Sequence, residues 1–190
     1  MPIRKVPLIE NQYYHIYNRV IEGRKLFYEE QNYILYLKLL KEVDFSSCCR
    51  LCAYCLMPTH YHYLVQITDA DVFPKKMSYF LNRYLKSLSS AKDETGRYFK
   101  NRFQAKLIDN DEYLIMVCGY IHLNPIKANL VTSLAQWPYS NYLEFIGKRN
   151  GTLWDRTFFE TYIRSPEQYE HYLRSKYTEK DIESYIFEKD

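Results

Sequence analysis

A hairpin in the first half of the chain is the feature that most constrains its fold. Leu51 to Leu56 and His60 to Ile67 are two mostly apolar runs of strand length, and Met57-Pro58-Thr59 breaks the pattern between them. A connection this short joins antiparallel neighbours, because a parallel pair needs a crossover of a dozen or more residues. The sequence therefore predicts an antiparallel sheet built around this hairpin.

The other elements follow from hydrophobic periodicity. Alternation predicts strands over 13–18 and 105–108, and apolar stripes at helical spacing predict helices over 31–44 and 74–92. A third helix is expected to begin at Asp109, capped by that residue together with Glu112, and Pro125 should kink or stop it. This order of elements resembles a split β-α-β plan and predicts an α+β fold, an antiparallel sheet with helices on one face.

Length and composition limit the class of protein. The 190 residues suggest one domain over 1–147, followed by a helical extension over 148–190 whose aromatic residues are expected to pack on the body. The five glycines lack the spacing of a phosphate-binding loop, which argues against a Walker-type nucleotidase and a Rossmann dehydrogenase. The chain shows no apolar leader and no run of membrane-span length, so we expect a soluble, cytoplasmic protein.

Four of the five cysteines lie close together, and Cys49, Cys52 and Cys55 have the spacing of zinc ligands. Zinc ligands normally pair on a turn, whereas this stretch is a predicted strand, on which Cys52 and Cys55 should point to opposite faces. A reduced cysteine also behaves as a small buried hydrophobe. The core interpretation is therefore preferred over structural zinc.

Basic residues concentrate between Lys75 and Lys106. This window holds nine basic and two acidic residues, a net charge of +7, whereas the whole chain carries +3. A solvated helix face would explain the charge alone. The interleaved aromatic residues, however, suit a surface that follows a nucleic-acid backbone and stacks bases. The pattern favours polyanion binding.

Two histidines are the first candidates for chemistry. On a strand His60 and His62 project from the same face, about 6 to 7 Å apart, which allows both imidazoles to bind one divalent metal. A pair of structural histidines would give the same pattern, so context has to decide.

In the third helix, Tyr120 and Asn124 are four residues apart and share one face, which suits a nucleophile beside a metal ligand. With 21 tyrosines in the chain, any one of them is more often a packing residue, and Asn124 could equally cap a turn. His122 points away from that face and receives no role.

These motifs occur in the order found in a known family. From about residue 13 to 147 the chain resembles the HUH single-tyrosine transposases, specifically the REP-associated tyrosine transposases. The matching stretches are Tyr14-His-Ile-Tyr-Asn-Arg19, Lys25-Leu-Phe27, Ala53-Tyr-Cys-Leu-Met-Pro-Thr-His-Tyr-His62, Arg102-Phe103, Asp111-Glu-Tyr-Leu114, Tyr120-Ile-His-Leu-Asn-Pro-Ile-Lys127 and Trp137-Pro-Tyr-Ser-Asn-Tyr142. Val20 stands where the family usually has glycine, so the first loop is expected to differ in shape.

The resemblance implies a ferredoxin/RRM-like HUH fold and assigns roles to individual residues. Tyr120 would be the nucleophile, and His60, His62 and Asn124 would hold Mg²⁺ or Mn²⁺. The expected partner is single-stranded or hairpin DNA, bound by a monomer or a homodimer. The expected DNA-binding residues are Arg19, Lys75, Lys76, Arg83, Lys86, Lys100, Arg102 and Lys106.

The implied activity is nicking and transfer of single-stranded DNA through a 5′-phosphotyrosine intermediate at hairpin-associated sites, without ATP. Two alternatives stay open at this point. A non-catalytic nucleic-acid-binding module of the same fold would form no DNA adduct. A metal-dependent hydrolase would release products and leave no strand linked to the protein.

Overall fold

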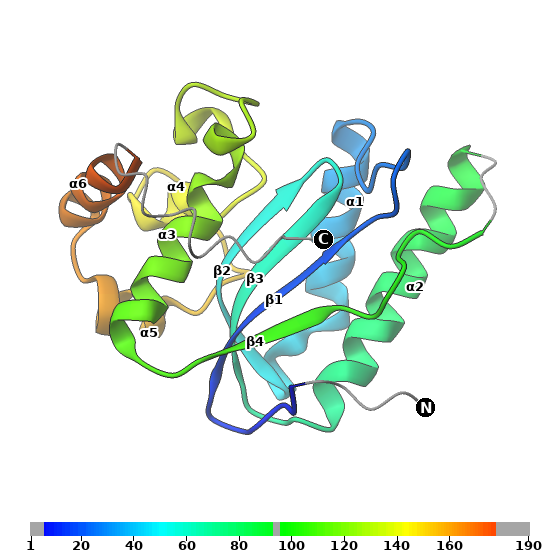
Figure 1. Ribbon diagram of the computed structural model, residues 1–190, viewed down its shortest axis with the longest axis horizontal. Helices are drawn as coiled ribbons and strands as arrows, with labels where there is room; N and C mark the ends of the chain where they lie inside the picture. The colour runs from blue at the N-terminus through cyan, green and yellow to red at the C-terminus, as the bar shows by residue number, and fades with distance from the viewer. Residues whose placement is uncertain (1–5, 93–95, 178–190) are drawn as a thin grey trace.

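Four antiparallel strands form the centre of the molecule. The computed structural model describes residues 6–92 and 96–177, and the side chains up to 175. The strands β1 (Tyr13–Arg19), β2 (Cys49–Met57), β3 (His60–Ile67) and β4 (Gln104–Ile108) pair in the order β2-β3-β1-β4 (Figure 1). The predicted hairpin is β2-β3, closed where Met57 pairs with His60.

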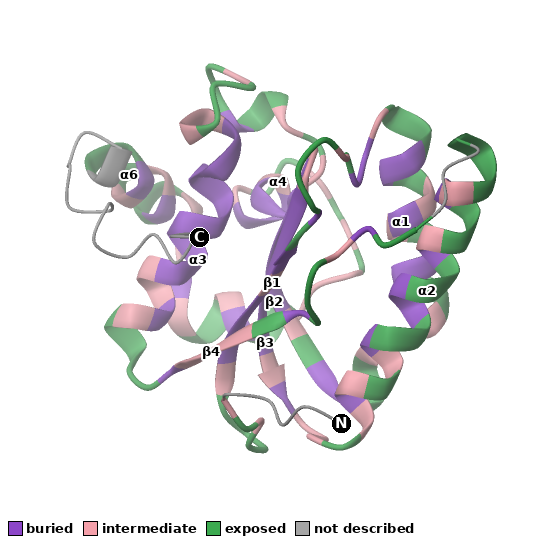
Figure 2. Ribbon diagram, turned by 45° about the vertical axis from the view of Figure 1, so that its right-hand side comes forward, coloured by how far each residue is buried: buried purple, intermediate pink, exposed green. Residues whose placement is uncertain are grey.

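Helices cover both faces of this sheet. The helices α1 (Glu30–Val43) and α2 (Val72–Lys92) lie on one side, and α3 (Asp111–Lys127) lies on the other together with the later helices (Figure 1). The α+β class and the antiparallel sheet are confirmed, but the expectation of helices on one face applies only to α1 and α2. The reason lies in the strands, since β2 and β3 are buried on both faces (Figure 2). Tyr61 and Tyr63 pack in the core under α1 and α2, and Leu64 packs under α3.

The two ends of α3 differ from the prediction. The N-cap is Asn110 rather than Asp109, and its side-chain oxygen accepts a hydrogen bond from the backbone N–H of Tyr113 at 2.8 Å. The helix also continues past Pro125 to Lys127. Because Pro125 has no N–H, it cannot donate to the carbonyl of Ile121 four residues earlier. The side-chain amide of Asn124 lies 3.4 Å from that carbonyl and compensates for the missing donor.

The outer edge of β2 is covered by the segment that follows α3. After a short turn, η2 (Leu134–Gln136), the indole N–H of Trp137 donates to the carbonyl of Leu56 at 3.1 Å. The backbone N–H of Leu56 in turn donates to Tyr139, and that of Asn141 donates to Tyr54. These bonds satisfy the backbone groups that an edge strand would otherwise expose.

The last described part of the chain forms short helices that pack on α3. They are α4 (Tyr142–Phe145), α5 (Arg156–Phe158), a π-helical turn η3 (Phe159–Ile163) and α6 (Pro166–Tyr177). The remaining short element, the 3₁₀ turn η1 (Phe45–Ser47), lies earlier in the chain and precedes β2. Phe158, Tyr169 and Leu173 share one buried cluster with α3. The division at residue 147 stays a prediction, because this cluster runs across it. Residues 1–5, 178–190, and Asp93 and Glu94 of the basic window lie outside the described residues.

The cysteines correct one detail of the sequence analysis. The register between β2 and β3 shifts between Leu51 and Ala53, so a bulge resets the alternation and Cys52 and Cys55 pack in the same cluster under α3. All five cysteines lie in the described ranges, are buried and form no disulfide. Among the described helices, none is long and apolar enough to cross a membrane.

Candidate active site

The candidate site lies on the face of the sheet that α3 covers. Because side chains alternate along a strand, β3 directs His60 and His62 to this face. In the register of the sheet, His60 pairs with Arg19 and His62 pairs with Tyr17 of β1. The structure therefore brings the two predicted metal ligands together with the end of β1.

The two histidines are close, buried and neutral. Their ring centroids are 4.9 Å apart, and their side chains are 8% and 0% exposed. Burial, assisted by the charge of Arg19, lowers the pKa of His60 to about 3, and burial also holds the pKa of His62 well below its usual range. Both imidazoles are therefore uncharged at neutral pH, the form that binds metals.

His15 on β1 is a site residue to which the sequence analysis gave no role. Its Nε2 lies 2.9 Å from Nδ1 of His62, and the two rings stack. Burial, together with Lys106, lowers the pKa of His15 to about 3, so the pair shares one hydrogen bond between neutral rings. The available signal was its position in the sequence, two residues before Tyr17 and therefore on the same face of β1.

Tyr120 projects from α3 onto this cluster. Its ring meets those of His62 and His15 edge-on, with centroids 5.7 Å and 5.9 Å away, and the side chain is 7% exposed. The helix is held over the sheet by a buried stripe that includes Val117 and Ile121. The packing of α3 thus brings Tyr120 beside His62 and His15, which lie 58 and 105 residues earlier in the chain.

Asn124 lies one turn beyond Tyr120 and is also buried. Its side-chain N–H donates to the backbone carbonyl of Tyr120 at 2.8 Å, in addition to the contact with Ile121. These bonds fix the amide nitrogen on the helix, so the amide oxygen is the atom that a metal would take.

The predicted DNA-binding residues fall into two groups. Arg19 and Lys106 lie at the site, since Arg19 pairs with His60 in the sheet and Lys106 pairs with His15. Lys100 and Arg102 are exposed in the segment beside the end of β1, where Asn18 donates to the carbonyl of Asn101.

The second group lies on α2, across the sheet from α3. Arg83 pairs with Glu42 of α1 at 3.1 Å, and Lys76 donates to the backbone carbonyls at the end of α1. Lys75 and Lys86 are exposed on the same helix. The structure therefore does not bring these four residues together with Tyr120.

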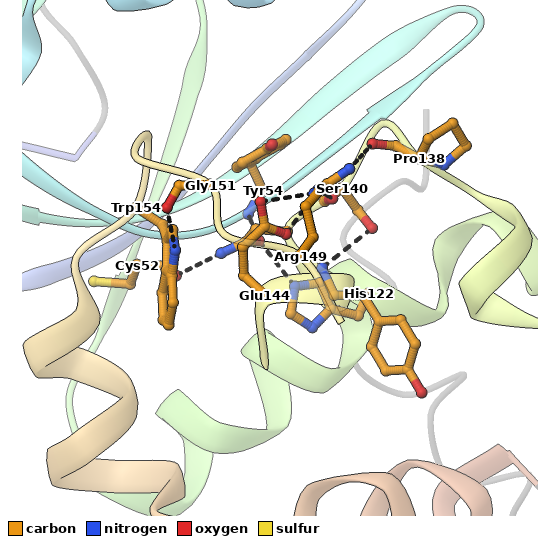
Figure 3. A network of polar contacts seen from close by, with 11 residues as sticks. Cys52, Tyr54, His122, Pro138, Ser140, Glu144, Arg149, Gly151 and Trp154 are labelled. Atoms are coloured by element: carbon orange, nitrogen blue, oxygen red, sulfur yellow. Dashed lines mark hydrogen bonds and ion pairs between the residues drawn. The ribbon is translucent and has the colours of Figure 1, made fainter. Parts of the chain in front are cut away.

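A network of buried polar groups holds α3 to its surroundings (Figure 3). His122 lies 2.7 Å from the hydroxyl of Tyr169 on α6 and 2.9 Å from Oδ1 of Asn141. Asn141 also accepts from the N–H of Tyr54 and donates to the carbonyl of Cys52, both in β2. His122 therefore connects α3 with the sheet edge and the C-terminal helices.

Arg149 and Glu144 close the same network from the outside. The guanidinium of Arg149 binds both carboxylate oxygens of Glu144, at 2.8 and 2.7 Å, and also donates to the carbonyls of Pro138 and Ser140 (Figure 3). Gly151 lies against Glu144, where an added Cβ would come within 2.0 Å of Oε1. This ion pair fixes the segment that covers β2.

The residues present fit a divalent metal bound by two imidazoles and an amide oxygen. Nδ1 of His60 is hydrogen-bonded to the hydroxyl of Thr59, and Nδ1 of His62 is hydrogen-bonded to His15. Hydrogen bonds of this kind orient metal-binding histidines, and they leave Nε2 of each ring as the atom that would bind an ion. Within residues 6–92 and 96–177, no three His, Cys, Asp or Glu side chains form a metal-binding group. A metal here would therefore depend on an oxygen from Asn124, from the DNA or from water.

Comparison with known proteins places the chain in a family. A model of the family "Transposase IS200 like" matches residues 8–124, which is more than half of the chain. A Haemophilus influenzae protein, provisionally described as a REP-associated tyrosine transposase, is 27% identical over 100 residues, covering 47% of this chain and 57% of the relative. The chain thus spans little more than half the length of that relative.

A solved structure has the same fold. It is a REP-associated tyrosine transposase bound to a REP hairpin, superposes with a TM-score of 0.63 at 17% identity, and is matched over 82% of this chain and 94% of its own. The fold, the antiparallel sheet with its C-terminal helices, and the extent of the family match lead to one conclusion. This chain belongs to the IS200-like transposase family.

Proposed function

We propose that the protein is a metal-dependent nickase and strand transferase for single-stranded DNA, and that Tyr120 is its nucleophile. The observation that carries this proposal is the position of Tyr120 on α3, against the paired rings of His62 and His15 on the sheet. Membership of the IS200-like transposase family supports it.

His60, His62 and the amide oxygen of Asn124 would hold Mg²⁺ or Mn²⁺. When bound, such an ion polarises a phosphate and neutralises charge that develops on its oxygens. The role of the protein is to keep the imidazoles neutral by burial and to orient His62 through its hydrogen bond to His15.

The reaction exchanges one phosphodiester for another. The Tyr120 hydroxyl oxygen attacks the phosphorus, so that a bond from Oη to phosphorus forms and the bond to the 3′ oxygen breaks. The phenolic proton ends on that 3′ oxygen, which leaves a 5′-phosphotyrosine and a free 3′ hydroxyl. A second 3′ hydroxyl reverses the step and joins two strands, so neither ATP nor hydrolytic water is required.

We infer that the substrate is single-stranded DNA next to a hairpin. The related solved structure was bound to a REP hairpin, and Arg19, Lys100, Arg102 and Lys106 surround the site with positive charge. These cations suit a backbone that passes over the sheet and reaches Tyr120.

Covalent capture tests the proposal. The protein is incubated with hairpin-bearing single strands and Mg²⁺ or Mn²⁺, and an SDS-resistant adduct is measured. We expect Tyr120→Phe to abolish the adduct and to leave DNA binding within about twofold. The matched control is Tyr113→Phe, which removes a hydroxyl two helical turns earlier on the same helix and should leave capture intact.

The other outcomes identify the alternatives. Binding without an adduct in the wild-type protein would support a non-catalytic nucleic-acid-binding module. Cleavage with both products released would support a hydrolase. An adduct that persists in Tyr120→Phe would show that another residue is the nucleophile.

A further inference from the structure

Lys127 is a partly buried lysine whose ammonium nitrogen is enclosed beside the proposed nucleophile, and the proposed reaction does not yet use it. Its Nζ lies 4.7 Å from the centroid of the Tyr120 ring. The two residues are seven apart on α3, two helical turns, and therefore share one face of the helix with Asn124 between them. Lys127 thus continues the line formed by Tyr120 and Asn124.

This ammonium has no anionic partner among the described residues. Its nitrogen is buried, and within residues 6–92 and 96–177 it makes neither a hydrogen bond nor an ion pair. Among the described residues, its charge faces the Tyr120 ring. Arg149, a half-buried cation elsewhere in the protein, is by contrast paired with Glu144.

Such an arrangement is costly unless an anion completes it. An unpaired ammonium loses hydration when it is buried, and a contact with an aromatic face recovers only part of that loss. Burial lowers the pKa of Lys127 to about 8, so the side chain is still mostly protonated at neutral pH. The anion that has to come to this place is the phosphate that Tyr120 attacks.

We propose that Lys127 binds the scissile phosphate and stabilises the negative charge on its non-bridging oxygens during attack by Tyr120. The lysine stem is long and flexible, so the ammonium can leave the ring face and reach a phosphate held at the Tyr120 hydroxyl. Lysine serves here as a point charge, which needs no fixed orientation of the phosphate. This inference rests on the proposed function, because it needs Tyr120 to be the nucleophile.

The first step of the test establishes the reacting phosphate. Wild-type protein is captured on a hairpin-bearing strand with Mn²⁺, and the position of the adduct is mapped. If the wild-type protein gives no adduct with this ordinary strand, the proposed function fails and this inference fails with it. If it does, a second strand is made with an uncharged methylphosphonate at the mapped position. The remaining experiments then test Lys127 alone.

Binding is measured in Tyr120→Phe, which keeps the aromatic ring and cannot react. We expect the added change Lys127→Met to weaken binding of the ordinary strand about tenfold, which is the effect of losing one charged contact. The same change should alter binding of the methylphosphonate strand by less than about twofold, because the charge that Lys127 recognises is absent. Equal weakening of both strands would overturn the proposal and assign Lys127 a structural role.

Rate gives the second measurement. With Tyr120 intact, Lys127→Met should slow adduct formation by about 100- to 1,000-fold at saturating DNA, and Lys127→Arg should restore part of the rate. The matched control is Lys38→Met on α1, an exposed lysine on the far face of the sheet, which should react at the wild-type rate. A wild-type rate in Lys127→Met would also overturn the proposal. The melting temperature of Lys127→Met should stay the same or rise, because methionine replaces an unpaired buried charge.

Discussion

His15 shows how one side chain can matter for a site without touching the substrate. It lies on β1, two residues before Tyr17, and the two rings stack. Its Nε2 is hydrogen-bonded to Nδ1 of His62. If Nε2 of His62 binds a metal as proposed, its Nδ1 would carry the proton and donate it to His15. His15 would then select the tautomer and the ring orientation that metal binding requires.

Replacement of His15 should weaken metal binding more than it weakens the fold. We expect His15→Ala to raise the Mn²⁺ concentration for half-maximal adduct formation by about 10- to 100-fold, which is typical for loss of a partner of a metal-binding histidine. His15→Gln, whose amide can occupy the position of Nε2, should restore much of the affinity. His171→Ala, a change of an exposed histidine on α6, is the control and should have no effect. An unchanged Mn²⁺ requirement in His15→Ala would exclude this role.

At the scale of elements, the position of α3 depends on buried polar contacts as well as on its apolar stripe. Asn141 is fully buried and satisfies three groups at once: the N–H of Tyr54, the carbonyl of Cys52 and Nε2 of His122. Through it the helix that carries Tyr120 is connected to the edge strand of the sheet. His122 has no role at the candidate site because it contacts Tyr169 and Asn141, on a different side of α3 from Tyr120.

Asn141→Ala should therefore destabilise the protein strongly. The change leaves a buried donor, a buried acceptor and a histidine without their partner, and each such group costs about 1 to 3 kcal/mol. We expect the free energy of unfolding, measured in urea, to fall by about 3 kcal/mol or more. Asn150→Ala, at an exposed position nearby, should change it by less than about 0.5 kcal/mol. Similar values for the two variants would show that the network contributes little.

At the scale of the whole molecule, the sheet separates two basic surfaces. Arg19 and Lys106 lie on the face of the sheet that carries the site, whereas Lys76 and Arg83 lie on α2 and make contacts with α1. A DNA strand bound at Tyr120, as proposed, would pass the first surface and would have to go around the molecule to touch the second (Figure 1).

Salt dependence of DNA binding distinguishes these surfaces. Arg19→Gln should weaken binding of a hairpin-bearing strand and reduce the slope of log affinity against log salt by about one, because one phosphate contact is lost. Arg83→Gln should change the slope much less, since its charge is already paired with Glu42. Equal changes in slope would indicate that the DNA also follows α2. Both measurements use Tyr120→Phe, so that cleavage does not interfere.

The sequence by itself determined the local features of this protein. The hairpin over β2 and β3, the helices and the same-face placement of His60 and His62 all follow from periods of two or 3.6 residues, which are written in neighbouring positions. The family resemblance rests on the same local motifs, and it is confirmed by the match over residues 8–124. The predicted N-cap of α3 was wrong by one residue. The helix also does not stop at Pro125, because Asn124 supplies a donor that periodicity does not show.

Only the tertiary structure decided which residues meet. Helices on both faces of the sheet, the bulge that turns Cys52 to the side of Cys55, the contact of His15 with His62 and the place of Lys127 on the Tyr120 ring all join positions far apart in sequence or depend on packing between elements. Sequence periodicity assigns a side chain to a face of its own element. It does not say which element covers that face, because this depends on packing of the whole chain. The candidate active site is assembled at such a contact, between α3 and the sheet.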